Sequence, residues 1–143
     1  MADYNQYDPA QNILIVHGHI ITGFAPGSFI TAERDNDSFT DEVGADGSVT
    51  RVKSHDKRGT ITITLMGEAP SNNILSAINV ADELIGSGSG NVKLTNLNSA
   101  TAINAANGWV MKPANFEAAD TTSPREWKIR CASLSMFIGG AII

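Results

Sequence analysis

The chain has 143 residues, 42% of them hydrophobic and 17% charged, enough for one globular domain with its own core but not for two. Its net charge of −5 excludes the concentrated basic surface with which proteins grip nucleic acid through its phosphates. No apolar run approaches the roughly 20 residues of a membrane-spanning helix, and residues 1–5 lack the basic and apolar segments of a secretory signal. We therefore expect residues 1–143 to form a single soluble domain without a membrane anchor. It either stays in the compartment where it is made or leaves it by a route other than a signal peptide.

Strand signals dominate the beginning of the chain. Residues 13–16 form a short run rich in β-branched side chains, and the run continues after Gly18 through residues 20–22. Residues 29–33 have the composition of a second strand. The pattern indicates a mainly β protein.

Residues 34–59 are rich in charged residues, Asp, Ser and Gly. Asp46-Gly47 predicts a tight turn before a short strand over residues 48–53. Such a long, partly paired segment is uncommon in a compact domain unless it has a task, so we interpret it as an extended arm used in assembly. Its mixed charges suit head-to-tail association, and they suit a self-neutralising loop equally well. The residues assigned to the arm contact are Arg34, Asp35, Asp37, Asp41, Asp46, Arg51 and Lys53.

The clearest strand covers residues 60–66, where apolar and hydroxyl side chains alternate. Side chains two residues apart share a face of a strand. The sequence thus predicts a core face formed by Ile61, Ile63 and Leu65. The opposite face is a row of small hydroxyls formed by Thr60, Thr62 and Thr64.

One helix is expected over residues 71–86, packed on the sheet. Ser71 is a plausible N-cap, and Gly86 supplies the stop signal. The apolar side chains repeat at helical spacing, which predicts the stripe that faces the core. The stripe consists of Ile74, Ala77, Ile78, Ala81, Leu84 and Ile85.

Further strands are expected at residues 92–94, 101–103, 109–111 and 125–138. In the last of these, the apolar face changes phase at Cys131-Ala132. A strand that changes its buried face needs a bulge or a bend, or it passes from one packing environment into another.

Potential metal sites in the sequence are incomplete. His17 and His19 share a face of the first expected strand, but the local sequence offers no third ligand, and coordination needs three or four. The pair fits surface or interface histidines better. Counted from Asp35, the acidic run places Phe39 at position five and Thr40 where a calcium loop needs glycine. We therefore expect no metal.

No motif predicts catalysis or a cofactor. The glycine-rich residues 86–90 follow a helix and lack the lysine of a phosphate-binding loop. No serine lies in a nucleophile elbow, and no carboxylate pair lies in an apolar setting that would separate two pKa values. Cys131, the single cysteine, rules out an internal disulfide and fits a small buried residue. We expect a protein that is not an enzyme.

Four stretches, in this order, resemble one protein family. They are I-T-A-E-R-D-N-D-S-F-T at residues 30–40, V-G-A-D-G-S-V-T-R at 43–51, G-T-I-T-I-T-L-M leading into P-S-N-N-I-L-S-A within 59–82, and R-E-W-K-I-R-C-A with M-F-I-G-G within 125–140. The chain resembles the tail tube proteins of contractile-tailed bacteriophages from about residue 13 to residue 140. No single motif is diagnostic, but four in order argue against chance.

The resemblance implies a β-sandwich or half-barrel with one packed helix. It implies a virion structural protein that forms six-membered rings, stacked into a tube through which DNA is ejected without specific binding. Implied partners are further copies of the chain and the sheath, tape-measure, baseplate hub and tail terminator proteins. The protein would be made in the host cytoplasm and reside in the virion tail.

A small-residue, weakly charged lining would let DNA slide. Candidates for this lining are Thr60, Thr62 and Thr64, or Ser133 and Ser135. Two alternatives stay open. One is the inner tube of a phage-derived bacteriocin or secretion device, and the other is a small-molecule-binding β-barrel or enzyme, for which no converging polar groups are found.

Overall fold

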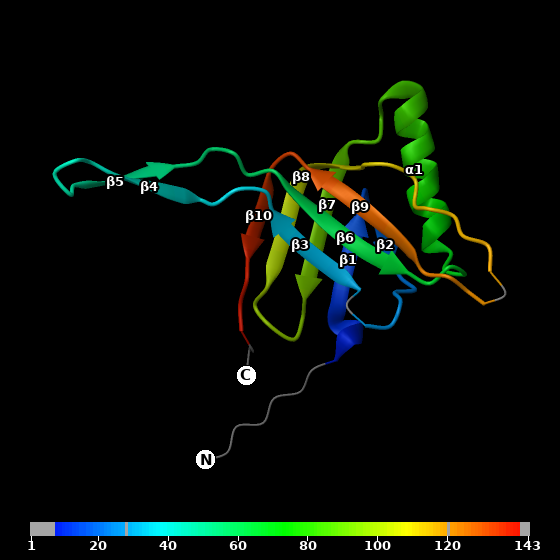
Figure 1. Ribbon diagram of the computed structural model, residues 1–143. Coiled ribbons are helices and arrows are strands. Elements are labelled where there is room, and N and C mark those ends of the chain that lie inside the picture. Colours follow the sequence, from blue (N-terminus) through cyan, green and yellow to red (C-terminus); the bar gives the residue numbers. More distant parts are fainter. Residues whose placement is uncertain (1–7, 28, 120, 141–143) are drawn as a thin grey trace, which may run out of the picture.

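The structure, a computed structural model, describes residues 8–27, 29–119 and 121–140. The expectation of no secretory signal concerns residues 1–5, which lie outside this part. Within it, strands and one α-helix surround one core (Figure 1). The elements are η1 (Pro9–Gln11), β1 (Asn12–Val16), β2 (His19–Ile21), β3 (Ile30–Arg34), β4 (Phe39–Val43), β5 (Val49–Lys53), β6 (Gly59–Leu65), α1 (Ser71–Ile85), β7 (Gly90–Asn96), β8 (Ala102–Val110), β9 (Arg125–Cys131) and β10 (Leu134–Phe137).

Eight strands form one sheet that folds over into two layers. The order is β2-β1-β7-β8-β9-β6-β3, and β10 also pairs with β8. The first half of β8 lies between β7 and β10, and its second half pairs with β9. The first layer is therefore β2-β1-β7-β8-β10, the second is β8-β9-β6-β3, and β8 belongs to both. The mainly β sandwich with one helix, predicted from the sequence, is confirmed.

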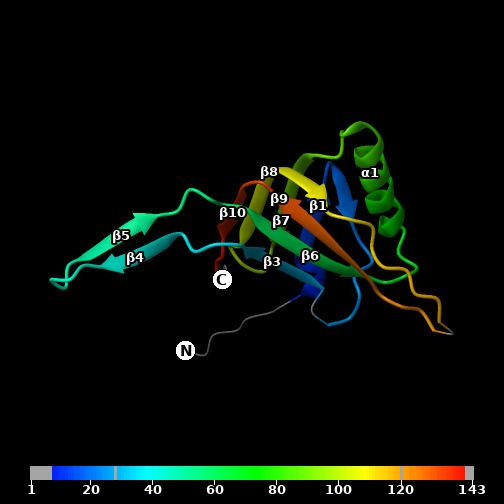
Figure 2. The same ribbon diagram turned by 45° about the horizontal axis from the view of Figure 1, so that its top comes forward.

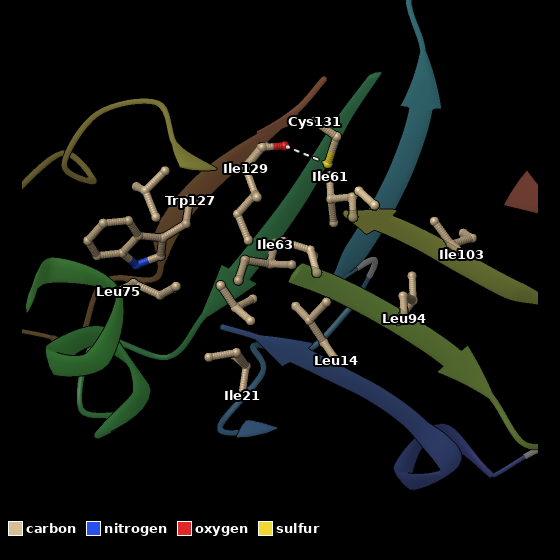
Figure 3. Packing of buried hydrophobic residues seen from close by; sticks show 14 of the residues in the cluster. Leu14, Ile21, Ile61, Ile63, Leu75, Leu94, Ile103, Trp127, Ile129 and Cys131 are labelled. Atoms are coloured by element: carbon tan, nitrogen blue, oxygen red, sulfur yellow. Dashed lines mark hydrogen bonds between the residues drawn. The ribbon is translucent and has the colours of Figure 1, made fainter. Parts of the chain in front are cut away.

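The core fills the space between the layers (Figure 3). Leu14, Leu94 and Ile103 of the first layer face Ile63 and Ile129 of the second. Along β6 burial alternates strictly, so the predicted inward face is confirmed. Burying such aliphatic side chains contributes roughly 1.5–3 kcal/mol each, so this face contributes several kcal/mol to the stability of the fold.

The first predicted strand is interrupted by a turn. His17 (φ 51°) and Gly18 (φ 85°) both adopt left-handed conformations, which suits a two-residue hairpin turn. β2 therefore runs back along β1, with Ile15 opposite Ile20, and the expected continuation through residues 20–22 is wrong. Histidine is uncommon at positive φ. The pair His17-Gly18 is therefore a weak sequence signal for this turn.

The helix occurs where the sequence predicts it, but its start and its buried face differ. Pro70 is the N-cap residue, and the Ser71 hydroxyl accepts a hydrogen bond from the Thr22 N–H (2.9 Å) instead. The prediction of Ser71 as N-cap is therefore wrong, whereas Gly86 ends the helix in a left-handed conformation (φ 69°) as expected.

The buried helix residues are Ser71, Leu75 and Asn79. The predicted apolar stripe is confirmed only in part. Ile74 and Ile78 are half-buried and pack against the core, whereas Ala81 is half-buried and Ala77, Leu84 and Ile85 are exposed. Only Leu75 enters the core as a large side chain, since α1 packs at one side of the sandwich rather than across a layer (Figures 1 and 2). No helix in the described ranges has the length and hydropathy to cross a membrane.

The C-terminal strand bends as its change of phase predicts. β9 buries Trp127, Ile129 and Cys131, and β10 buries Leu134, with two exposed residues between them. The N–H of Ala132 donates to the Asn107 carbonyl (3.0 Å) at this bend. The chain thereby passes from the second layer into the first. The strands expected at residues 101–103 and 109–111 are one strand, β8, which makes the same crossing.

Candidate assembly surfaces

The predicted arm at residues 34–59 contains a β-hairpin that projects from the body of the molecule (Figures 1 and 2). β4 and β5 pair along their full lengths and form a sheet of their own. The Gly44 N–H donates to the Ser48 carbonyl (2.7 Å) across the turn, and Gly47 takes a left-handed conformation (φ 88°). The predicted turn and β5 are confirmed. The sequence does not predict β4, because its acidic residues are depleted in strands generally.

Every residue of β4 and β5 is exposed. Near the tip, the register partners Val43 and Val49 are 68% and 65% exposed. Near the base, the Arg51 guanidinium carbon lies 4.2 Å from the centre of the Phe39 ring. An isolated two-stranded hairpin is marginally stable in water, so this arm has the properties of a contact surface for another chain.

Charged side chains hold the base of the arm against the sheet. Arg130 of β9 donates to both carboxylate oxygens of Asp35, one at 2.9 Å, and Arg58 pairs with Asp56 at 2.9 Å. Arg34 Nε donates to the first carbonyl of β10 (2.8 Å). Arg130 lowers the pKa of Asp35, and Arg58 lowers the pKa of Asp56, so both carboxylates stay ionised at neutral pH. These contacts set the direction in which the arm leaves the body.

The charged residues predicted for the arm contact are spread along its length. Arg34 and Asp35 lie at the base, and Asp46 lies at the tip, where the N–H and hydroxyl of Ser48 bond its carboxylate and lower its pKa. Between base and tip lie Asp37, the register partners Asp41 and Arg51, and Lys53. The acidic residues do not converge, and the described ranges hold no group of three side chains suited to a metal.

Sequence reasoning misses Arg130 as a base residue. The pairing of β6 with β9 brings it opposite Thr60, whose hydroxyl it also contacts (3.1 Å). Asp56 and Arg58 are also absent from the predicted set, although opposite charges two residues apart in a connection are a signal that sequence inspection can find.

The two sets of residues predicted for the tube lining lie on opposite outer faces of the sandwich. Thr60, Thr62 and Thr64 point away from the core on the second layer. Ser135 is paired with Asn104 on the outer face of the first layer, and Ser133 lies in the exposed bend before β10. One channel cannot be lined by both layers of a subunit, so at most one set faces a lumen.

The two outer faces differ in chemistry. On β3, β6 and β9 the outward positions are uniformly hydrophilic: Thr31, Glu33, Thr60, Thr62, Thr64, Glu126, Lys128 and Arg130. The outer face of the first layer carries Ile13, Ile15, Ile20 and Phe137 among its polar residues. On β8, which also belongs to the second layer, half-buried Trp109 points outward opposite Arg130, so this face is mainly hydrophilic. Such a face is suited to water, whereas the more apolar outer face of the first layer is suited to contact with protein.

An open groove of about 450 Å³ runs between α1 and the β1–β2 turn. His17 and His19 line one wall, with His17 Nε2 2.9 Å from the Gly108 carbonyl oxygen. The opposite wall contains Ile74 and Ile78 of the helix. Ile74 and Ile78 therefore pack against the core on one side and border this groove on the other.

Open strand edges complete the set of surfaces. β2 and β3 end the sheet, so in the described part of the chain each of them pairs on one side. β7 covers β8 only as far as Gly108, which leaves residues 109–110 paired with β9 alone. Unpaired edges are sites for strand addition from another chain.

Comparison with known proteins shows the family of the chain. The model of the bacteriophage PhiTE tail tube protein family matches residues 13–139. The chain belongs to this tail tube family. The predicted family, and with it a structural protein of a bacteriophage tail, is confirmed.

A curated relative is structural protein ORF10 of Pseudomonas phage KPP10, which is 32% identical over 82 residues. That match covers 53% of this chain and 47% of the relative, so the chain spans about half the length of that protein.

Solved structures of contractile injection systems share the fold of this tail tube protein. The cap that terminates the tube of the anti-feeding prophage superimposes with a TM-score of 0.67 at 13% identity, over 97% of this chain and 95% of that one. The sheath/tube terminator of the extracellular injection system PVC gives 0.67 at 14%, over 96% and 100%. A chain of the PVC sheath–tube complex gives 0.64 at 14%, over 92% and 91%.

Proposed function

We propose that this protein is the tail tube subunit of a contractile phage tail, assembling into stacked hexameric rings that conduct DNA during ejection. The observation that supports this most is the family match, which extends across both layers, the arm and the helix. The shared fold of tube-terminating and sheath–tube chains agrees with it.

The second layer has the strand order needed to close a ring of copies. It contains four strands, β8-β9-β6-β3, each antiparallel to its neighbour. In a cyclic ring all copies have the same orientation, so the first strand of one copy runs opposite to the last strand of the next. β3 then adds to the open end of β8 in an antiparallel seam, and the ring becomes a closed barrel without edges.

The lumen is proposed to be the outer face of the second layer, with Thr60, Thr62 and Thr64 at its centre. Glu33 and Glu126 balance Lys128 and Arg130 on this face, so it has no concentrated positive charge. Phosphate contacts made by lysine and arginine dominate binding to DNA. A charge-balanced, hydroxyl-rich wall therefore lets DNA pass without holding it.

The remaining parts of the proposal follow from this assembly. The arm reaches a neighbouring copy, and the apolar outer face of the first layer contacts protein. Further partners in this proposal are the sheath, tape-measure, baseplate hub and terminator proteins. The proposed function requires neither catalysis nor a cofactor. The subunit is made in the host cytoplasm and ends in the virion.

A phage-derived injection device is the second candidate, because the similar solved chains come from such systems. The subunit would have the same fold in both, as part of a different device. Neighbouring genes for a capsid and DNA packaging distinguish a phage from such a device.

Electron microscopy of the purified protein, and of particles that contain it, tests the proposal. Hollow rings or tubes built from this chain are expected, with six copies in each ring. Particles whose tube is made of a different protein would contradict the proposal. Failure of the isolated subunit to polymerise decides less, since tubes can require a nucleating partner.

A further inference from the structure

The arm and a long connection lie at opposite ends of the second layer. Gly59, at one end of β6, follows the arm and pairs with Arg34 and Cys131. Leu65, at the other end of β6, pairs with Arg125, the residue that follows the connection 111–124. Figures 1 and 2 show the arm on one side of the body and this connection on the other. A contact between these two ends in different copies is head-to-tail, which extends without limit.

The connection has the features of a receiving surface. Residues 111–119 and 121–124 contain no helix or strand, and such long irregular connections in compact domains are usually functional. Phe116 is 81% exposed, with the Arg125 guanidinium carbon 5.3 Å from its ring centre. A hollow of about 480 Å³ lies between the connection and the start of β9. It borders one end of the face proposed as the lumen, because Glu126 and Lys128 belong to both. Its lining is Lys112, Pro113, Ala114, Asn115, Glu117, Pro124, Glu126 and Lys128.

Charge and hydrophobicity on the arm tip complement this hollow. Between residues 41 and 49 the arm carries three carboxylates, Asp41, Glu42 and Asp46, and no lysine or arginine. The lining of the hollow carries two cations, Lys112 and Lys128, and two carboxylates, Glu117 and Glu126. Arg125, which lies against the exposed Phe116 ring, adds a third cation beside it. The exposed Val43 and Val49 of the tip match the exposed Phe116. Opposite charges around an apolar contact favour one orientation of association.

We propose that the arm tip of one copy docks into the hollow beneath residues 111–119 of the next copy. The inference deepens the proposed function and rests on it, since it names the surface that receives the arm. Val43 and Val49 cover Phe116, and Glu42 faces Lys112. Docking buries the apolar tip that a single copy leaves in water.

Disulfide trapping tests the contact without requiring complete tubes. Protein carrying Ala45→Cys at the tip is mixed with protein carrying Asn115→Cys in the hollow and is mildly oxidised, and the linked peptides are identified by mass spectrometry. The matched control replaces Asn115→Cys with Ser76→Cys, at an exposed position on α1. We expect the 45–115 disulfide to exceed the 45–76 disulfide by at least about tenfold, because docking raises the local concentration. Equal yields, or no 45–115 disulfide, would overturn the proposal.

A charge exchange supplies the second measurement. Glu42→Lys alone and Lys112→Glu alone are each expected to weaken self-association about tenfold, and the double variant to recover it. Light scattering follows association, and circular dichroism checks that each variant is folded. Single variants that associate like the original chain would contradict the docking site. If tubes are seen by microscopy but the disulfide forms elsewhere, this inference fails while the proposed function stands.

Discussion

The position of a side chain in the sheet decides how much it contributes to the stability of the fold. Ile63 is fully buried between the layers, whereas Ile20 on β2 is 60% exposed. The two residues have the same side chain and lie in strands of the same sheet. Their contributions to stability therefore differ through burial alone.

We predict that Ile63→Ala lowers the free energy of unfolding by about 2–5 kcal/mol, because it removes buried methyl groups and leaves a cavity. The matched change Ile20→Ala alters it by less than about 0.5 kcal/mol in the monomer. Urea denaturation followed by circular dichroism measures both. Similar losses in the two variants would show that the layers are not packed as described.

Cys131 gives a second prediction at this scale. Burial raises the pKa of its thiol to about 11, so at pH 8 the thiolate that reacts with disulfide reagents is scarce. The folded protein should react with such a reagent only as fast as it unfolds, and fully in denaturant. Rapid labelling of the folded protein at pH 8 would contradict the burial of this residue.

At the scale of elements, local signals predict some features and miss others. The alternation in β6 and the stop signal at Gly86 act within a few residues, so the sequence reveals them. The helix face is predicted only in part, because Ile74 and Ile78 pack against the core but also line an open groove. Amphipathic spacing predicts that a helix face will be shielded from water. It does not show whether the same chain or another chain shields it.

The arm provides the prediction at this scale. The Asp35 N–H donates to the Arg58 carbonyl (3.0 Å), so the ends of the arm are already adjacent and a two-residue Asn-Gly turn can replace residues 36–57. We expect this variant to remain a folded monomer and to fail in assembly. Circular dichroism and sedimentation measure the two properties. Unfolding of the variant would show that the arm belongs to the core, and normal assembly would show that it has no role in contacts.

For the whole molecule, the division into two outer faces is the main result. The hydrophilic face of the second layer and the mixed face of the first follow from the way β8 and the β9–β10 bend cross between layers. This arrangement separates Thr62 from Ser135, which the sequence leaves as alternatives for the lumen.

We predict that assembled tubes of Thr62→Lys retain DNA, because one added cation in every copy produces rings of positive charge inside the tube. The matched variant Ser135→Lys, on the opposite outer face, should not retain DNA in the lumen. Particles of each variant are compared for the completeness of DNA ejection at low and high salt, since phosphate contacts weaken as salt rises. Retention by Ser135→Lys instead would place the lumen on the first layer.

The sequence by itself determined the fold class, the helix, the arm and the family, because these depend on short-range periodicity and on runs of residues. It also placed the bend near Cys131, where the alternation changes phase. Only the tertiary structure decided that Arg130 holds the base of the arm and that the helix residues Ile74 and Ile78 border a groove. It also decided that the threonines of β6 and the two serines lie on opposite outer faces of the sandwich. These features depend on which strands pair across long distances, and pairing is set by the packing of the whole chain rather than by local pattern.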